Sequence, residues 1–168
     1  INTYNIGNLE NYDGIVDGIE NTNYLIVCNQ KKYVLTIFEN RVKEEDLPFF
    51  INLKLYLSKN NFKCPKPIEN TNGKIINSIK DKKAIIISFI EGKKINNPST
   101  RQCKVIGEMV GDLHNLTIDF TQRRENSLGI VEWRSLYNKC ENSKEKKFDK
   151  ILFELKNEKN YLEKSWPS

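Results

Sequence analysis

The sequence predicts an α+β fold in which a five-stranded antiparallel sheet carries one inserted helix and is followed by helices only. Three observations support this prediction. Two pairs of β-rich segments are joined by short polar turns, one amphipathic segment separates the pairs, and only helical periodicity follows residue 98. The pattern changes near Glu91–Pro98. We therefore expect a sheet-containing domain of residues 1–92 and the beginning of a helical domain in residues 93–168.

The first pair of strands is expected at residues 22–28 and 32–38, joined by the polar turn Asn29–Lys31. The second segment of this pair is rich in β-branched and aromatic residues, which favour strands. Together with a further segment at residues 9–15, the pair predicts a three-stranded meander.

A helix is expected after Glu44–Asp46, because acidic residues at a helix start complement the helix dipole. Pro48 fits only in the first turn of such a helix. Apolar residues then recur at three- and four-residue steps, which predicts one buried stripe. The stripe consists of Leu47, Phe50, Ile51 and Leu55. The prolines of Cys64–Pro67 predict an extended segment after this helix.

A second hairpin is expected from residues 73–79 and 83–90, and the uninterrupted apolar run within 84–90 predicts a central strand buried on both faces. Ser99 and Gln102 have the spacing of a capping box, so a helix is expected to begin there. Two more helices are expected near residues 131–140 and 143–163. The apolar face of the helix after Ser99 consists of Cys103, Ile106, Val110, Leu113 and Leu116.

The composition excludes several classes of protein. The net charge is +5, but basic and acidic residues are interspersed, so no nucleic-acid partner is predicted. No apolar run is long enough to cross a membrane and the N-terminus does not resemble a signal peptide, so we expect a cytoplasmic protein without membrane contact. The four cysteines, Cys28, Cys64, Cys103 and Cys140, form no C-x-x-C pair, and we expect free thiols.

Two glycines four residues apart, Gly14 and Gly18, precede a polar cluster and then an apolar segment. Small residues in this position allow backbone N–H groups to approach a phosphate, but they also mark ordinary turns. The G-x-x-x-x-G-K-[ST] pattern of a P-loop is absent, because Gly73-Lys74 and Gly92-Lys93 lack the upstream glycine and the following Ser or Thr.

The order of elements and several motifs resemble homoserine kinases, a branch of the protein-kinase-like superfamily that is related to aminoglycoside phosphotransferases and choline kinases. The likeness extends over nearly the whole chain. The segments that carry it are Gly14–Tyr24, Tyr33–Glu39, Glu45–Phe49, Cys64–Ile68, Ser88–Gly92, Gly107–His114, Asp119–Phe120, Asn126–Gly129 and Trp133–Arg134. The resemblance implies a kinase-like N-terminal lobe followed by the first helices of an incomplete helical lobe.

The resemblance also implies an activity, the transfer of the γ-phosphoryl group of ATP to the hydroxyl of L-homoserine in threonine biosynthesis. ATP and Mg²⁺ are the implied cofactors. The loop at residues 14–23 is expected to close over the triphosphate, and the hinge backbone around Ser88–Ile90 is expected to pair with adenine. The expected cofactor-binding residues are Gly14, Gly18, Glu20, Asn21, Asn23, Thr36, Ser88, Phe89 and Ile90.

Two departures from the wider superfamily stand out. Thr36 occupies the position at which many relatives carry a lysine or arginine for the phosphates. Glu45 is therefore either the partner acid of the helix without its lysine or a surface acid that complements the helix dipole.

The second departure concerns the H-x-D-x-x-x-x-N catalytic loop. In Val110–Thr117 only the Asp matches, and this stretch lies in a periodic helix, so we interpret Asp112 and His114 as structural. We expect no catalytic residue and no metal ligand in this chain. The Mg²⁺ ligands are expected in a missing C-terminal part, and the fragment alone is expected to be inactive.

Two alternatives stay open at the level of the sequence. The same fold serves other small hydroxylated acceptors, such as amino alcohols, aminoglycosides or hydroxylysine. A non-catalytic module that binds a nucleotide is the second alternative.

Overall fold

The computed structural model describes residues 1–16, 21–39, 42–126, 129–142 and 149–165. Two compact units make up the chain, Ile1–Arg123 and Arg124–Ser168. The division at residue 92 into a sheet-containing and a helical domain stays a prediction. Within the first unit, the last strand of the sheet ends at Ser88 and the next helix begins at Thr100.

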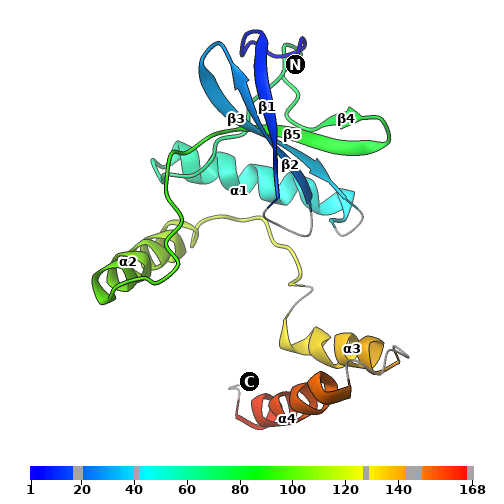
Figure 1. The fold of residues 1–168 in the computed structure, drawn as a ribbon. Helices are drawn as coiled ribbons and strands as arrows, with labels where there is room; N and C mark the ends of the chain where they lie inside the picture. Colours follow the sequence, from blue (N-terminus) through cyan, green and yellow to red (C-terminus); the bar gives the residue numbers. More distant parts are fainter. Residues whose placement is uncertain (17–20, 40–41, 127–128, 143–148, 166–168) are drawn as a thin grey trace. The chain divides into compact units, whose positions relative to one another are not determined.

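The first unit contains a five-stranded antiparallel sheet with the strand order β1-β2-β3-β5-β4 (Figure 1). This confirms the predicted fold class. The strands are β1 (Leu9–Ile15), β2 (Asn21–Cys28), β3 (Lys31–Phe38), β4 (Asn77–Ile79) and β5 (Lys82–Ser88).

The turn between β2 and β3 has two residues, because Cys28 pairs with Lys31. Asn29 and Gln30 have φ angles of 45° and 59°. Positive φ at both central residues is the geometry of the tight hairpin turns that match the twist of the strands. The polar turn predicted at Asn29–Lys31 is therefore present.

The strand β4 is shorter than expected, because residues 73–76 of the segment predicted as a strand lie in a loop. The Asn70 side chain explains the difference. Its Oδ1 accepts hydrogen bonds from the backbone N–H groups of Asn72 and Lys74, each at 2.9 Å. Gly73 between them has a φ of +72°. An asparagine that collects local backbone donors in this way competes with the sheet ladder.

The two faces of the sheet are covered differently. The outer face is defined by Ile26, Cys28 and Ile86, which form a core cluster with Ile6 of the N-terminal segment. The inner face is defined by Thr36 and Ile85, which pair across β3 and β5. Side chains alternate between faces along a strand, so the two sets point in opposite directions.

Ala84, Ile85 and Ile86 of β5 are all buried, as predicted for a central strand.

The helix α1 (Leu47–Lys59) follows the short 3₁₀ turn η1 (Glu44–Asp46) and lies against the inner face (Figure 1). It buries Leu47, Ile51 and Leu57. The chain returns to α1 after the next helix. Phe120 packs against the rings of Phe49 and Tyr56, with centroids 5.8 and 5.3 Å apart, and is itself buried.

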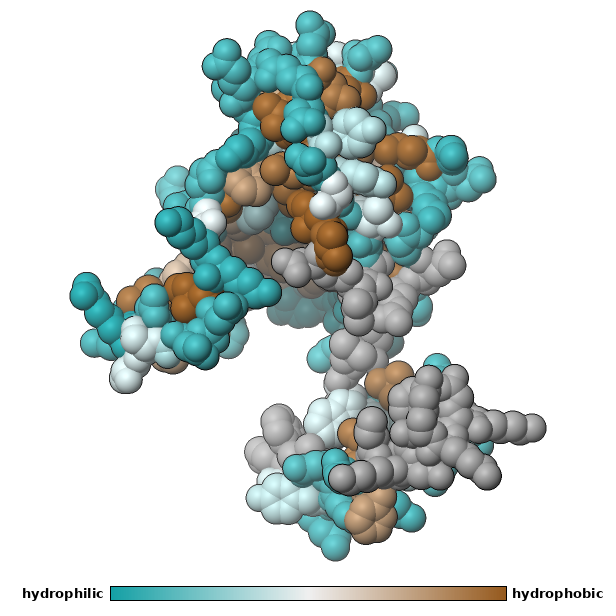
Figure 2. Space-filling model, in the orientation of Figure 1, coloured by the Kyte–Doolittle hydropathy of each residue, from teal (hydrophilic) through white to brown (hydrophobic). Residues whose placement is uncertain are grey.

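The helix α2 (Thr100–Leu116) begins with the predicted capping box, in which Ser99 and Gln102 bond each other reciprocally. It has an apolar face but no buried residue. Figure 2 shows apolar side chains at its surface, and Ile106 is 58% exposed. The pattern thus predicted the helix correctly without identifying what it packs against.

The second unit contains α3 (Ile130–Glu141) and α4 (Asp149–Ser165), which contact each other. Within the described residues, no helix combines the length and the apolarity that a membrane crossing requires.

Candidate nucleotide-binding site

The loop between β1 and β2 is held at its neck by two strand pairs. We use the term loop neck for Gly14 and Ile15 on β1 together with Asn21–Tyr24 on β2. Gly14 pairs with Tyr24, and Ile15 pairs with Asn23. A Cβ atom added at Gly14 would meet no heavy atom within 4 Å, so the backbone here is open to a ligand. The predicted residues Gly18 and Glu20 lie outside the described residues.

Thr36 and Asn23 form the polar centre of the inner face. They are paired across β2 and β3, and the Thr36 hydroxyl donates a hydrogen bond of 2.8 Å to Asn23 Oδ1. Thr36 is only 8% exposed. A threonine supplies no charge for a phosphate, and its one proton is already used. In this geometry Thr36 fixes the orientation of the Asn23 carboxamide, because its hydroxyl bonds Oδ1 and the Nδ2 group lies on the opposite side of the carboxamide.

The Asn23 Nδ2 group makes one long hydrogen bond of 3.5 Å, to the backbone oxygen of Asn21. The second N–H has no acceptor within the described part of the chain. Asn21 adds a buried side-chain oxygen, Oδ1, for which the same residues provide no donor. Buried polar atoms are normally paired. The loop neck therefore has an Asn23 N–H without an acceptor and an Asn21 oxygen without a donor among the described residues, and such groups are suited to a polar ligand.

Three half-buried apolar side chains continue the inner face from Thr36 toward the end of β5. Val34 lies two residues before Thr36 and pairs with Leu25 on one side and with Ile87 on the other. This apolar patch, Leu25, Val34 and Ile87, is suited to the face of a flat ring. Sequence reasoning missed it, because alternation from Thr36 points only to Val34, whereas the strand register brings Leu25 and Ile87 beside it.

The hinge segment, residues 88–90, is held mainly by backbone hydrogen bonds. The Ser88 N–H donates to the Lys66 oxygen at 2.8 Å, and Ser88 Oγ accepts from the Lys66 N–H at 2.9 Å. The Phe89 N–H donates to the Lys32 oxygen at 3.3 Å. Of the three predicted hinge residues, Ile90 alone keeps an N–H without an acceptor among the described residues.

A charge pair also connects β3 to the residue that follows the hinge segment. Lys32 Nζ lies 2.8 Å from Glu91 Oε1 and 5.4 Å from the centre of the Phe89 ring. Both charged side chains are well exposed, so this pair contributes little stability. It links β3 to the segment that follows β5.

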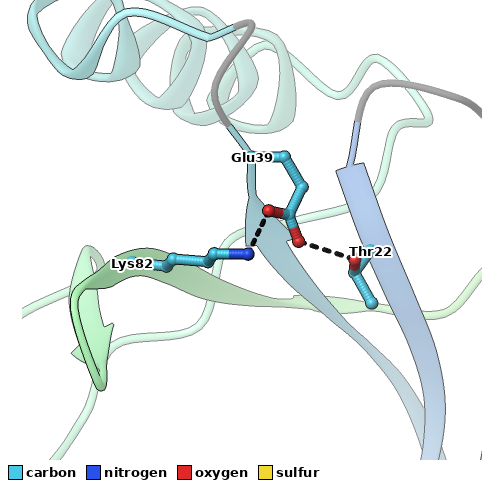
Figure 3. Close-up of polar contacts among 3 residues, drawn as sticks. All are labelled: Thr22, Glu39 and Lys82. Atoms are coloured by element: carbon cyan, nitrogen blue, oxygen red, sulfur yellow. Dashed lines mark hydrogen bonds and ion pairs between the residues drawn. The ribbon is translucent and has the colours of Figure 1, made fainter.

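A second polar cluster lies at the opposite end of β5 and was not predicted from the sequence. Glu39, which follows β3, accepts a hydrogen bond of 2.8 Å from the Thr22 hydroxyl and pairs with Lys82 through its other oxygen (Figure 3). The pKa of the Glu39 carboxyl is lowered from its usual value, mainly by the hydrogen bond from Lys82 and to a smaller extent by the hydrogen bond from Thr22. The separation of 43 residues between Glu39 and Lys82 conceals this contact in the sequence.

Glu45 pairs with Lys43 at 3.7 Å, and its side chain is 77% exposed. It lies in η1, before the first turn of α1. This position is that of a surface acid at a helix start, the second of the two roles considered for it.

Asp112 and His114 lie in the regular helix α2, and both are exposed. Thr117, at the position that an asparagine would occupy in a catalytic loop, instead caps the helix by donating to the Leu113 oxygen at 2.9 Å. Across the described residues, no three His, Cys, Asp or Glu side chains are close enough to hold a metal ion.

Comparisons with known proteins identify the family and the fold of this chain. Residues 12–168 match the phosphotransferase enzyme family. Homoserine kinases of Brucella canis and Brucella suis are 36% identical over an alignment of 168 positions, which covers 98% of this chain and 51% of each relative. The chain therefore spans about half the length of these curated relatives.

Two solved structures share the fold. One is spectinomycin phosphotransferase in complex with ADP and spectinomycin, with a TM-score of 0.61 at 17% identity, over 94% of this chain and 51% of that chain. The other is an aminoglycoside phosphotransferase from Alicyclobacillus acidocaldarius, with a TM-score of 0.61 at 10% identity, over 94% of this chain and 48% of that chain. On the match of residues 12–168, this chain belongs to the phosphotransferase enzyme family.

Proposed function

We propose that this chain forms the nucleotide-binding part of an ATP-dependent kinase that phosphorylates the hydroxyl of L-homoserine. The observation that carries the nucleotide part is the inner face of the sheet. It combines an open carboxamide N–H of Asn23 at the loop neck, a half-buried apolar patch and a backbone N–H at Ile90 that has no acceptor among the described residues.

These three features have the order that ATP requires. In this proposal the Asn23 carboxamide donates to a phosphate oxygen through its second N–H, because Thr36 occupies Oδ1 and the other N–H makes a long hydrogen bond to the Asn21 backbone oxygen. The patch of Leu25, Val34 and Ile87 receives the adenine ring. The Ile90 N–H donates to a ring nitrogen of adenine, since the N–H groups of Ser88 and Phe89 are already bonded.

Mg²⁺ does not fit the described residues, because these provide no cluster of acidic side chains. In this proposal the ligands of Mg²⁺ and the base that activates the acceptor hydroxyl come from elsewhere in the working enzyme. The assignment of homoserine as the acceptor is supported by the curated relatives at 36% identity.

Calorimetric titration of the 168-residue chain with ATP, and separately with adenosine, tests the nucleotide part. We expect saturable binding of both, with the tighter binding for ATP. No heat of binding for either ligand, from a chain that melts cooperatively, would contradict the proposal.

The acceptor is tested with a polypeptide that extends this chain to the length of its relatives. We expect ATP-dependent phosphorylation of L-homoserine in preference to ethanolamine, hydroxylysine and spectinomycin. A preference for one of those three would replace homoserine as the acceptor while leaving the nucleotide site in place. Turnover of homoserine by the 168-residue chain itself would contradict the expectation that it is inactive alone.

A further inference from the structure

Glu39 connects three strands of the sheet through one carboxylate. It follows β3 directly, its Oε1 accepts from Thr22 at the start of β2, and its Oε2 pairs with Lys82 at the start of β5 (Figure 3). Thr22 lies between Asn21 and Asn23, the two residues that present carboxamides at the loop neck. The Glu39 side chain is 31% exposed and that of Lys82 is 50% exposed.

The loop neck is thereby held from both faces of the sheet. Thr22 and Asn23 are neighbours along β2, so their side chains point to opposite faces. Asn23 is fixed on the inner face by Thr36 at 2.8 Å, and Thr22 is fixed on the outer face by Glu39 at 2.8 Å. A rotation of this strand end would break at least one of the two hydrogen bonds.

We propose that Glu39 is a positioning residue for the nucleotide site, acting through Thr22 to hold the neighbouring Asn23 carboxamide in place for phosphate binding. This inference rests on the proposed nucleotide-binding function. Glu39 lies on the outer face and contacts no nucleotide itself. Lys82 keeps the carboxylate in one orientation, so that Oε1 faces Thr22.

The ionisation of Glu39 agrees with this role. Lys82 and Thr22 both favour the charged form, which lowers the pKa of the carboxyl. At neutral pH the carboxylate therefore accepts both hydrogen bonds at once. A hydrogen bond to a charged acceptor is also stronger than one between neutral groups.

Affinities for ATP and for adenosine, measured on the full 168-residue chain, distinguish positioning from general support of the fold. Adenosine carries the ring but no phosphates. We expect Glu39→Ala and Thr22→Val to weaken ATP binding about fivefold and to leave adenosine binding unchanged, because a small displacement of the Asn23 donor is sufficient for such a loss. Thr22→Ser keeps the hydroxyl and is expected to restore the affinity for ATP.

Glu108→Ala is the matched control, because it removes an exposed carboxylate whose partner Lys104 lies one turn away on α2. It is expected to change neither affinity. If Glu39→Ala does not fold, Thr22→Val and Thr22→Ser decide the question, since both are small changes at a half-buried site.

Two results would overturn this inference alone, in a wild-type chain that binds ATP. One is an unchanged affinity for ATP in folded Glu39→Ala and Thr22→Val. The other is an equal loss of affinity for ATP and for adenosine, which indicates a general structural role. A wild-type chain that binds neither ligand would overturn the nucleotide-binding function and this inference with it.

Discussion

The loop neck and the hinge segment lie at opposite ends of the same sheet face, and they are held by different parts of the chain. Side chains fix the loop neck, through the Thr36–Asn23 and Glu39–Thr22 hydrogen bonds. The hinge is fixed largely by backbone, through the N–H groups of Ser88 and Phe89. Substitutions at the neck should therefore change ligand binding, whereas comparable substitutions at the hinge should change only stability.

The largest effect is expected from Asn23→Asp. An aspartate still accepts the Thr36 hydrogen bond, so the fold is retained, but its negative charge faces the phosphates of ATP. We expect ATP affinity to fall at least about tenfold, while adenosine affinity is unchanged. Asn96→Asp, in an exposed loop, adds the same charge away from the site and should have no effect. Equal ATP affinity in the Asn23 variant and the control would show that phosphates do not bind at the neck.

A smaller effect is expected from Thr36→Val, which removes the buried hydroxyl but keeps the shape. Asn23 then loses the donor that orients it, so ATP affinity should fall about threefold and the free energy of unfolding by about 1 kcal/mol. Thr121→Val, at an exposed position, is the control. Unchanged ATP affinity with reduced stability would make Thr36 a structural residue only.

Ser88→Ala removes a hydroxyl from the hinge instead of the neck. Its Oγ accepts from the Lys66 N–H, so its loss should lower the free energy of unfolding by about 1 kcal/mol. Nucleotide affinity should be unchanged, because the Ser88 hydroxyl that is removed bonds Lys66. A selective loss of adenosine binding would contradict the assignment of adenine pairing to Ile90.

The smallest effect is the pH dependence of the Glu39 contacts. The pKa of this carboxyl in the folded chain is below its ordinary value of 4.5, so its contacts stabilise the fold above the unfolded pKa. This stability is lost as the pH falls through the folded pKa. The difference in Tm between wild type and Glu39→Gln should therefore shrink between about pH 6 and about pH 3. A difference in Tm that grows as the pH falls would contradict this account.

Local patterns were sufficient to predict most of the fold. Segments rich in β-forming and apolar residues, joined by polar turns, predicted the two hairpins, and the capping box at Ser99 predicted the start of α2. Only part of the segment at 73–79 became a strand, because the competing hydrogen bonds of Asn70 are a matter of side-chain geometry that periodicity does not detect. The resemblance to homoserine kinases added the loop and the hinge as candidate regions.

Contacts between distant residues could not be predicted in the same way. In the sequence Glu39 is one more acidic residue after a strand, and only the folded sheet places Lys82 of β5 beside it. Both α1 and α2 have an apolar stripe at helical spacing, and the stripes give no sign that α1 buries Leu47 whereas α2 buries none of its residues. Register and topology, more than residue type, determine which side chains meet.

The most direct test of the central claim is to locate ATP on the chain by backbone amide chemical shifts. The 168-residue protein, labelled with ¹⁵N, is titrated with ATP and then with adenosine. The account predicts ATP-dependent shifts at Gly14, Asn21, Asn23 and Ile90, of which adenosine reproduces only the shift at Ile90. Shifts confined to other surfaces, or none at saturating ATP, would contradict a nucleotide site between the loop neck and the hinge.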